Sequence, residues 1–515
     1  MSRSAGAVCS EGAALAEAAI RRFLDSARQP ALIEPGEDRF LLAEDSYALE
    51  WQSGRLLIQV WDERRSLTRR VVGVEEERLG RLELAIERFG GLEGRISLLD
   101  LHRAGPAGTR RVPRLVLREQ FRRALRRQFP DWKLAELSAE ANLEESLSPA
   151  YPRALLRQGE SGWAAIAAPA GGAGGVLTFG LIWLDYLRKR ERRVTIEGLA
   201  LFLPQPEARA VCLRLPFLNP LAARFVPFVY TAEGYEDRLD SADYGNLATH
   251  LDRCAGRDPQ GPEHLVRWIE RLSAPPFVER VPRQDGSLSL RVRGLEFARA
   301  TGTELLFGLE RKTAAREGSI AEIEELARGI ARLRAPGAAQ PENPIWRAQS
   351  EAWLESQVRA NLEEIDATLH ADPVYGQVPA VAGVDRGVLD LLAADRRGRL
   401  AVIELKASED IHLPLQALDY WMRVRWHAER GDFSRQGYFP GIALGREWPR
   451  ILLVAPSLEF HPQTETVLKY FAPEIEVERI GLAVEWREKV RVMFRVRGAQ
   501  APLPESYGQR NLRPD

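Results

Sequence analysis

The stretch from Gly387 to Trp421 reads G-V-L-D-L-L-A-A-D-R-R-G-R-L-A-V-I-E-L-K-A-S-E-D-I-H-L-P-L-Q-A-L-D-Y-W. It contains two apolar runs, Val388 to Ala394 and Leu400 to Leu405, on either side of the turn signal D-R-R-G at 395–398. The two runs are therefore predicted to pair as a β-hairpin. A helix is predicted after the hairpin, beginning near Pro414, because proline is tolerated in the first turn of a helix.

Polar side chains are expected to gather at one end of this hairpin. Side chains alternate between the two faces of a strand, so Glu404 and Lys406 point the same way and Leu405 points into the core. Asp390 lies on the neighbouring strand and can meet Glu404 across the hairpin. On the predicted helix, Gln416 and Tyr420 are four residues apart and share a face.

This set of side chains suits metal-assisted hydrolysis of a phosphodiester. Two carboxylates a few ångströms apart repel each other unless a cation neutralises them. A hard divalent cation such as Mg²⁺ takes oxygen ligands and keeps several waters, and it can lower the pKa of one of those waters. A lysine beside the cation can hold the attacking water or offset charge that grows on the phosphate.

The combination of Asp390, Glu404-x-Lys406 and Gln416-x-x-x-Tyr420 resembles the PD-(D/E)XK nuclease superfamily, and in particular its RecB-type and NucS-like branches. The resemblance implies a mixed sheet flanked by helices, dependence on Mg²⁺ or Mn²⁺, and cleavage of DNA. It also implies that Asp390 and Glu404 bind the metal and that Lys406 assists the water. Gln416 and Tyr420 would organise the site or touch DNA.

The family often adds an acid from the helix that precedes the core. Here the sequence predicts that helix over Pro344 to Leu369, with Glu355 as the candidate third catalytic and metal-binding carboxylate and Glu351 as the alternative. The chain departs from the family pattern at Leu389, where the pattern has proline, a residue that many members also lack. The match covers about 343–485 of the sequence.

A second E-x-K pattern, Glu310-Arg311-Lys312, also follows an apolar run. Its middle residue is charged, no hairpin strand with an acid precedes it closely, and no Q-x-x-x-Y helix follows. The pattern at 404–406 is therefore favoured by its context and not by the motif alone.

The composition is that of an ordinary globular chain. The 515 residues are 45% apolar and 28% charged with a net charge of −1, so any basic surface must be local. Cys9, Cys212 and Cys254 have no C-x-x-C spacing and fit a reducing cytoplasm. No apolar run approaches the length of a membrane span, so we expect no membrane partner. Because nucleases that cut both strands commonly pair their sites, a homodimer is one expectation.

The fold class expected is a multidomain chain of α/β and α+β type. Residues 1–111 are predicted to form a helix and a β-rich module, 112–232 an α/β domain, 233–338 an α+β region, 343–500 the restriction-endonuclease-like domain and 501–515 a tail. Within the first module, residues 75–84 fit either a strand or a helix.

Residues 103–127 are the most basic part of the chain, with Glu119 as their single acid. Arg118, Arg122 and Arg126 are the candidates for contact with nucleic-acid phosphates, each of which would add salt-dependent affinity. The alternative is a solvated surface helix.

The α/β region at 112–232 repeats the order of the C-terminal core. Its strand at 163–169, a helix with L-D-Y at 184–186 and a strand at 198–204 correspond to 400–406, L-D-Y at 418–420 and 451–456. This pairing puts Ala167, Pro169 and Ile182 opposite Glu404, Lys406 and Gln416. We therefore hypothesise a degenerate, catalytically dead nuclease-like copy there; a chance likeness is the alternative.

The leading functional hypothesis is a metal-dependent deoxyribonuclease serving DNA repair, recombination or defence, and the sequence is compatible with either endonuclease or exonuclease action. The first alternative is a non-catalytic nucleic-acid-binding or scaffold protein that keeps a nuclease fold. The second is an interaction protein whose likeness to a nuclease is coincidental.

Overall fold

The structure is a computed structural model of the chain. It describes residues 4–27, 30–34, 40–43, 46–52, 54–61, 66–78, 81–87, 93–100, 111–230, 236–244, 247, 249–254, 261–283, 286–309, 311–338, 343–382 and 385–500. These fall into two compact units. Unit 1 comprises Met1–Gly245, Glu409–Pro414 and His461–Glu474, and unit 2 comprises Asn246–Ser408, Leu415–Phe460 and Ile475–Asp515.

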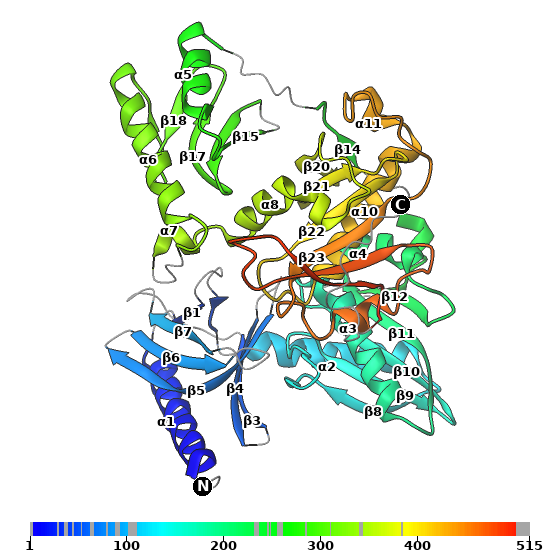
Figure 1. The fold of residues 1–515 in the computed structure, drawn as a ribbon. Helices are drawn as coiled ribbons and strands as arrows, with labels where there is room; N and C mark the ends of the chain where they lie inside the picture. Colours follow the sequence, from blue (N-terminus) through cyan, green and yellow to red (C-terminus); the bar gives the residue numbers. More distant parts are fainter. Residues whose placement is uncertain are drawn as a thin grey trace. The chain divides into compact units, whose positions relative to one another are not determined.

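Unit 1 begins with helix α1 (Ser4–Ser26) and an antiparallel sheet in the order β2-β1-β7-β6-β5-β4-β3 (Figure 1). Its strands are β1 (Pro30–Ile33), β2 (Phe40–Leu41), β3 (Tyr47–Gln52), β4 (Arg55–Trp61), β5 (Ser66–Arg78), β6 (Arg81–Glu87) and β7 (Glu93–Asp100). The apolar stripe of α1, which includes Ala16 and Ile20, packs on one face of this sheet. The residues at 75–84 that fitted two predictions are strand, except for 79–80, which lie outside the described residues.

The second sheet of unit 1 has the order β13-β12-β11-β10-β9-β8. Its strands are β8 (Lys133–Ser138), β9 (Arg153–Gln158), β10 (Ser161–Ala167), β11 (Thr195–Pro204), β12 (Arg224–Tyr230) and β13 (Glu236–Arg238). The helices are α2 (Arg111–Gln128), α3 (Ala173–Arg190) and α4 (Ala208–Arg214). Helix α2 covers the face that presents Trp163, Ala165 and Ala167, and α3 packs on the opposite face, where Gly180 approaches Ile166.

Unit 2 contains a smaller antiparallel sheet, β15-β16-β17-β18-β19, whose core includes residues of two amphipathic helices. The elements are α5 (Glu263–Ser273), β15 (Val278–Pro282), β16 (Leu288–Val292), β17 (Leu295–Ala300), β18 (Leu305–Phe307), β19 (Thr313–Ala314) and α6 (Ile320–Leu333). In this part of the chain, antiparallel strands and helices are separate along the sequence.

The larger sheet of unit 2 has the order β14-β20-β21-β22-β23-β24-β25. Its strands are β14 (His250–Leu251), β20 (Tyr375–Ala382), β21 (Asp385–Ala394), β22 (Leu400–Leu405), β23 (Arg450–Pro456), β24 (Val477–Leu482) and β25 (Val492–Arg497). The associated helices are α7 (Pro344–Arg347), α8 (Ser350–Ala360), α9 (Leu362–Ile365), α10 (Leu413–Glu429), α11 (Asp432–Arg435) and α12 (Thr464–Leu468).

One topology appears twice in the chain. In β8–β13 and again in β20–β25, the first three strands are antiparallel neighbours, the third, fourth and fifth are parallel, and the sixth is antiparallel. A helix precedes each sheet (α2 and α8), and a longer helix follows each third strand (α3 and α10). We call the elements α2 to β13 the first repeat and the elements α8 to β25 the second repeat.

Two details of the predicted organisation are wrong. The single helix expected over Pro344 to Leu369 is broken, because Gln349 adopts a left-handed backbone with φ of 49° and Asn361 leaves the helical region. The boundary expected near residue 338 also fails for β14, which pairs with β20 and so adds an edge strand from residues 250–251 to the C-terminal sheet.

The turn between β16 and β17 depends on a glycine. Gly294 has φ of +77°, and a Cβ built there would lie 2.1 Å from the carbonyl oxygen of Ala352 on α8. Gly286 has a nearly equal φ of +76° but no atom within 4 Å of its Cβ position. Substitution at each of the two glycines therefore distinguishes the cost of backbone strain alone from the cost of strain plus a steric clash.

We predict that Gly294→Ala lowers the free energy of unfolding by about 2–5 kcal/mol, because it combines left-handed strain with overpacking against α8. Gly286→Ala is the matched control and should lose only the strain, about 1–2 kcal/mol. Urea unfolding followed by circular dichroism measures both. Equal losses in the two variants would contradict the close approach of the turn to α8.

Candidate active site

The β21–β22 hairpin ends where two predicted carboxylates lie opposite each other. The last pair of its ladder joins Leu391 to Ile403, so the same register places Asp390 opposite Glu404. The Oδ2 atom of Asp390 accepts a hydrogen bond from the backbone N–H of Leu405 at 2.8 Å. Ile403 and Leu405 pack in the core against α8. Because side chains alternate along a strand, Glu404 and Lys406 point to the opposite face, as the sequence predicts.

Lys406 lies among acidic side chains. Its Nζ is 3.5 Å from Oε1 of Glu351, the residue that the sequence offered as an alternative to Glu355. Burial raises the pKa of Asp390 to about 7, and the charges of Glu351 and Glu355 act in the same direction, while Lys406 opposes them. The carboxyl group of Asp390 therefore keeps its proton to a higher pH than an exposed aspartate does, and a nearby cation would favour its ionised form.

Helix α10 brings the two remaining predicted residues to this end of the chain's second repeat. Burial raises the pKa of Tyr420, and the charges of Glu404 and Asp390 raise it further. The Tyr420 hydroxyl thus stays protonated at neutral pH and is available as a hydrogen-bond donor. The Oε1 atom of Gln416 is buried and has no hydrogen-bond partner among the described residues.

Glu355, the predicted third ligand, is held by two arginines. Its carboxylate pairs with Arg359 one turn later on α8, and Oε2 lies 4.0 Å from Nη1 of Arg291 on β16. A Cβ at Gly376 on β20 would lie 1.9 Å from Nη2 of Arg359, so only glycine leaves room for this pair. Glu355 therefore lies near Asp390 but is already neutralised by arginine.

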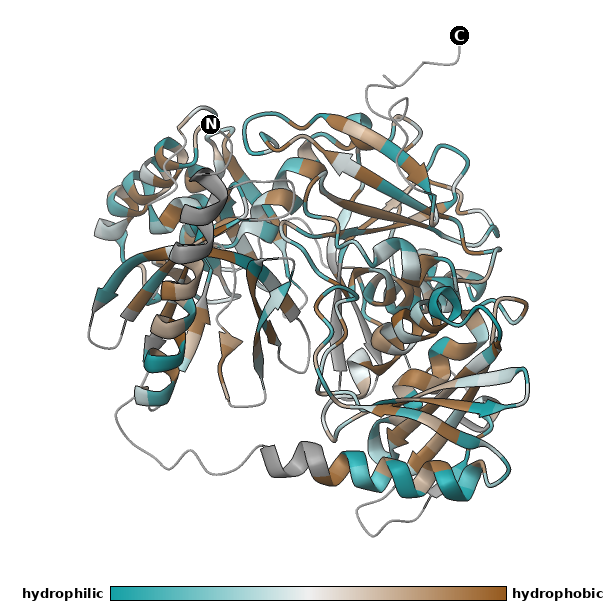
Figure 2. Ribbon diagram, turned by 90° about the horizontal axis from the view of Figure 1, so that it is seen from below, coloured by the Kyte–Doolittle hydropathy of each residue, from teal (hydrophilic) through white to brown (hydrophobic). Residues whose placement is uncertain are grey.

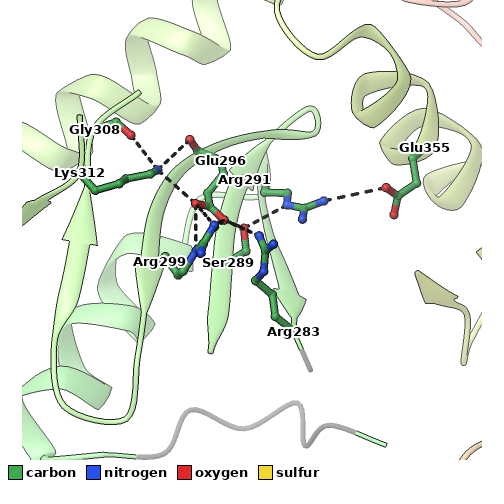
Figure 3. A network of polar contacts seen from close by, with 8 residues as sticks. All are labelled: Arg283, Ser289, Arg291, Glu296, Arg299, Gly308, Lys312 and Glu355. Atoms are coloured by element: carbon green, nitrogen blue, oxygen red, sulfur yellow. Dashed lines mark hydrogen bonds and ion pairs between the residues drawn. The ribbon is translucent and has the colours of Figure 1, made fainter. Parts of the chain in front are cut away.

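Figure 3 shows Arg291 in a network of polar contacts on the smaller sheet of unit 2. Its Nε donates to the hydroxyl of Ser289 at 3.0 Å, and Ser289 donates to Oε2 of Glu296 at 2.6 Å. Burial alone would raise the pKa of Glu296, but hydrogen bonds from Ser289, Arg299 and Lys312 outweigh it and lower that pKa to about 2. Lys312, from the second E-x-K pattern, is thus part of a structural ion-pair network.

The residues at the hairpin end fit a divalent cation bound through two carboxylates. Among the described residues, no three His, Cys, Asp or Glu side chains form a group that could hold a metal ion. Mg²⁺ does not require such a group, because it binds through one or two carboxylates and keeps several waters. Asp390 and Glu404 supply the two carboxylates, and the orphaned Oε1 of Gln416 is a further oxygen on α10.

The basic residues predicted to touch nucleic acid lie on α2. Arg118 and Arg122 contact Glu119 at 3.4 and 3.6 Å, and Arg126 is exposed. Figure 2 shows teal and brown alternating along this helix, whose apolar face, which includes Phe121 and Leu125, packs on the sheet of the first repeat. Both sequence interpretations, a phosphate-binding helix and a solvated surface helix, are compatible with this arrangement.

The register of the two repeats corrects the residue pairing drawn from the sequence. Ala167 packs on the α2 side of its strand as Leu405 packs on the α8 side, and the amides of Ala168 and Lys406 donate to equivalent parallel strands. Glu404 and Lys406 therefore correspond to Ile166 and Ala168, one residue before the pairing with Ala167 and Pro169. The pairing drawn from the sequence depended on the two L-D-Y segments of the helices, and these do not determine which face of a strand each residue occupies.

The same register puts Arg153 in the place of Asp390, because Arg153 is the partner of Ile166. The Arg153 guanidinium is buried, lies 5.5 Å from the ring centroid of Trp183 on α3, and donates to the carbonyl of Glu140. Burial lowers the pKa of Arg153 to about 10, while the charges of Glu136, Glu140 and Tyr186 oppose this shift. The first repeat thus has a cationic side chain where the second has an acid.

The sequence interpretation missed the arginine partners of Glu355. Arg359 follows Glu355 by four residues, a spacing that predicts an ion pair on a helix. Arg291 gave no such signal, because it comes from a separate sheet. His412, near the predicted site in sequence, is buried with Nδ1 2.9 Å from the hydroxyl of Thr178.

Comparison with protein-family models finds no matching family, and comparison with curated proteins finds no match. None of the helices in the described part of the chain combines the length and apolar character that a membrane span requires.

The raised pKa of Asp390 predicts a specific pH dependence. An acid whose pKa is higher in the folded protein than in the unfolded chain costs stability as pH rises through that higher value. The melting temperature of the metal-free protein should therefore fall between about pH 4 and about pH 7, and Mn²⁺ should raise it more at pH 7 than at pH 4. Differential scanning fluorimetry with and without Mn²⁺ measures this.

In Asp390→Asn, both the fall in melting temperature with pH and the rise in melting temperature caused by Mn²⁺ should be smaller than in wild type. Glu363→Gln, which alters an exposed carboxyl on α9, is the matched control and should behave like wild type. A Mn²⁺ effect that is as large in Asp390→Asn as in wild type would contradict metal binding at this carboxyl.

Proposed function

We propose that the protein is a metal-dependent nuclease of the PD-(D/E)XK type that hydrolyses DNA phosphodiester bonds. The observation that carries the proposal is the convergence of Asp390, Glu404, Lys406 and Tyr420 at the end of one hairpin and its following helix. The raised pKa of Asp390 supports it, because a desolvated carboxyl beside a second acid is a typical feature of functional sites.

In this proposal Asp390 and Glu404 would hold Mg²⁺ or Mn²⁺. A bound cation of this kind would polarise a phosphoryl oxygen and lower the pKa of a coordinated water. Asp390 is oriented by the amide of Leu405, and Glu404 is fixed by its position in a strand that is buried on both faces. The two carboxylates are therefore preorganised before a substrate arrives.

Lys406 would donate hydrogen bonds to the water or to a non-bridging phosphate oxygen as negative charge grows there. Its ion pair with Glu351 would restrict its side chain. Tyr420 and Gln416 would supply a hydroxyl donor and an amide group to the substrate or to ordered waters. Glu355, neutralised by Arg359 and Arg291, would support the wall of the site and not bind the metal directly.

We further propose that the first repeat is a non-catalytic copy of the same domain. The specific observation is the charge inversion at Arg153, together with apolar Ile166 and Ala168 at the places of Glu404 and Lys406. A buried guanidinium repels a divalent cation, so this copy would bind no metal. The arginines of α2, Arg118, Arg122 and Arg126, are the candidates by which it would contact DNA, and a homodimer would present two active sites to a duplex.

Cleavage of labelled single-stranded, double-stranded and branched DNA, and of RNA, with Mg²⁺ or Mn²⁺ tests the proposal. We predict metal-dependent cutting of DNA by wild type. Glu404→Gln and Lys406→Met should each lower the rate by about 100-fold or more, because both act on charge that develops in the transition state.

Lys489→Met is the matched control, since it makes the same substitution at an exposed lysine and should leave cutting intact. Cutting that persists in Glu404→Gln would contradict the assigned site. A folded wild type that cuts no nucleic acid, yet binds DNA with salt-dependent affinity, would favour the non-catalytic alternative.

A further inference from the structure

The loop between the catalytic strand and the catalytic helix belongs to unit 1. Strand β22 and Lys406 are in unit 2, and so is Gln416 on α10, but the six residues between Ser408 and Leu415 cluster with the N-terminal part of the chain. We call Glu409–Pro414 the connector. Both ends of the connector are covalently bonded to unit 2. Contacts that fix the conformation of the connector therefore also restrict the positions of Lys406 and Gln416.

A buried ion-pair group holds the first residue of the connector. Nη1 of Arg69, on β5 of the N-terminal sheet, lies 3.2 Å from Oε2 of Glu409, and its Nε lies 3.0 Å from Oε2 of Glu34. The side chains of Arg69 and Glu34 are 4% and 0% exposed, respectively. One buried guanidinium thus pairs with a buried carboxylate, Glu34, and a partly buried one, Glu409, and removing this cation would leave the buried carboxylate with an uncompensated charge.

Arg69 is a cationic partner of Glu409. Nε2 of His461 is also near, at 3.7 Å from Oε1 of Glu409. Burial lowers the pKa of His461 to about 4, so the imidazole is neutral at neutral pH and contributes no charge. Loss of Arg69 would therefore remove a positive charge beside Glu409 that the neutral His461 ring does not replace.

The middle of the connector is held by the first repeat. Nδ1 of His412 is 2.9 Å from the Thr178 hydroxyl on α3, and both side chains are buried. The His412 ring also packs edge-to-face on Phe179, with centroids 5.5 Å apart. The amide of His412 donates to Oδ1 of Asp410, which fixes the backbone within the connector.

A second loop of the catalytic sheet repeats this behaviour. Residues His461–Glu474, which follow β23, also cluster in unit 1. The backbone N–H of Asn219 donates to the carbonyl of Tyr470 at 2.8 Å, and the backbone N–H of Ala472 donates to the carbonyl of Phe217 at 2.9 Å. The loops after both parallel strands β22 and β23 are thus held by side chains and backbone from the first half of the chain.

We propose that Arg69 and Thr178 are positioning residues for the nuclease site, which act through the connector to fix Lys406 and α10 relative to the metal-binding carboxylates. This inference rests on the proposed function. It assigns the N-terminal module and the non-catalytic repeat a role in organising the active site, beyond any contact with substrate. Asp390 and Glu404 do not depend on the connector, because they are fixed within the β21–β22 hairpin of unit 2.

The test compares Arg69→Ala with Arg70→Ala in the full-length chain. The two arginines are neighbours on β5, but Arg70 pairs with Glu87 and does not contact the connector. Arg69→Ala should lower kcat by about 10- to 100-fold, because small displacements of positioned groups have effects of this size. The KM for DNA and the Kd for Mn²⁺ should change little. Arg69→Lys, which keeps a cation, should recover part of kcat, and Arg70→Ala should equal wild type.

Hydrogen exchange of the connector separates this role from general destabilisation. In Arg69→Ala the amides of residues 409–413 should exchange faster while those of β21 and β22 stay protected. If Arg69→Ala does not fold, Thr178→Val and Thr178→Ser provide a second pair. The valine variant removes the hydroxyl that meets His412 and should lower kcat, whereas the serine variant keeps it and should retain kcat.

The outcomes distinguish the two proposals. Wild-type cutting that is unchanged in Arg69→Ala and Thr178→Val would overturn the positioning role and leave the nuclease assignment standing. A parallel loss of kcat, Mn²⁺ affinity and hairpin protection would also overturn it, since that pattern indicates unfolding. Absence of cutting by wild type with a protected connector would overturn the proposed function itself.

Discussion

Two acidic side chains that face each other across a hairpin are the constraint around which the second repeat is arranged. Asp390 and Glu404 lie opposite each other in register, and Asp390 accepts the amide of Leu405 where the backbone ladder ends. Burial makes this pair costly to ionise together, as the raised pKa of Asp390 reflects. The surroundings reduce the cost with Lys406 on the same face, and with arginines that neutralise Glu355 nearby. In the proposed function, a divalent cation would supply the further positive charge that offsets these two carboxylates.

The two repeats show what happens when that constraint is removed. They share strand order, strand direction and flanking helices, yet the first repeat has Arg153 where the second has Asp390. The Arg153 guanidinium lies over the ring of Trp183 on α3. Near the end of α3, Asp185 pairs with Lys469 and the Arg188 guanidinium lies over the ring of Tyr470. Helix α3 of the first repeat thus contacts His412 and residues 469–470, which come from the C-terminal part of the sequence.

The smaller sheet of unit 2 has a comparable supporting role. Arg291 reaches Glu355, Glu279 accepts a hydrogen bond from Ser356, and the Gly294 turn meets the backbone of Ala352. All three contacts fall on α8, the helix whose other face packs on β21 and β22. The rigidity of α8, and with it the position of Glu351 beside Lys406, is therefore set by a sheet about 60 residues earlier in the chain.

The sequence by itself determined the hairpin, its turn, the shared face of Glu404 and Lys406, and a helix carrying Gln416 and Tyr420. Each of these follows from local rules, namely side-chain alternation, turn chemistry and helical spacing. It also revealed the repeated strand–helix–strand order, although it paired Glu404 with Ala167 instead of Ile166. Only the tertiary structure decided the partners of Glu355, the break of the helix at Gln349, the edge strand at 250–251 and the capture of the connector by Arg69 and Thr178. These depend on contacts between residues far apart in sequence, and such contacts leave no periodic signal in the chain.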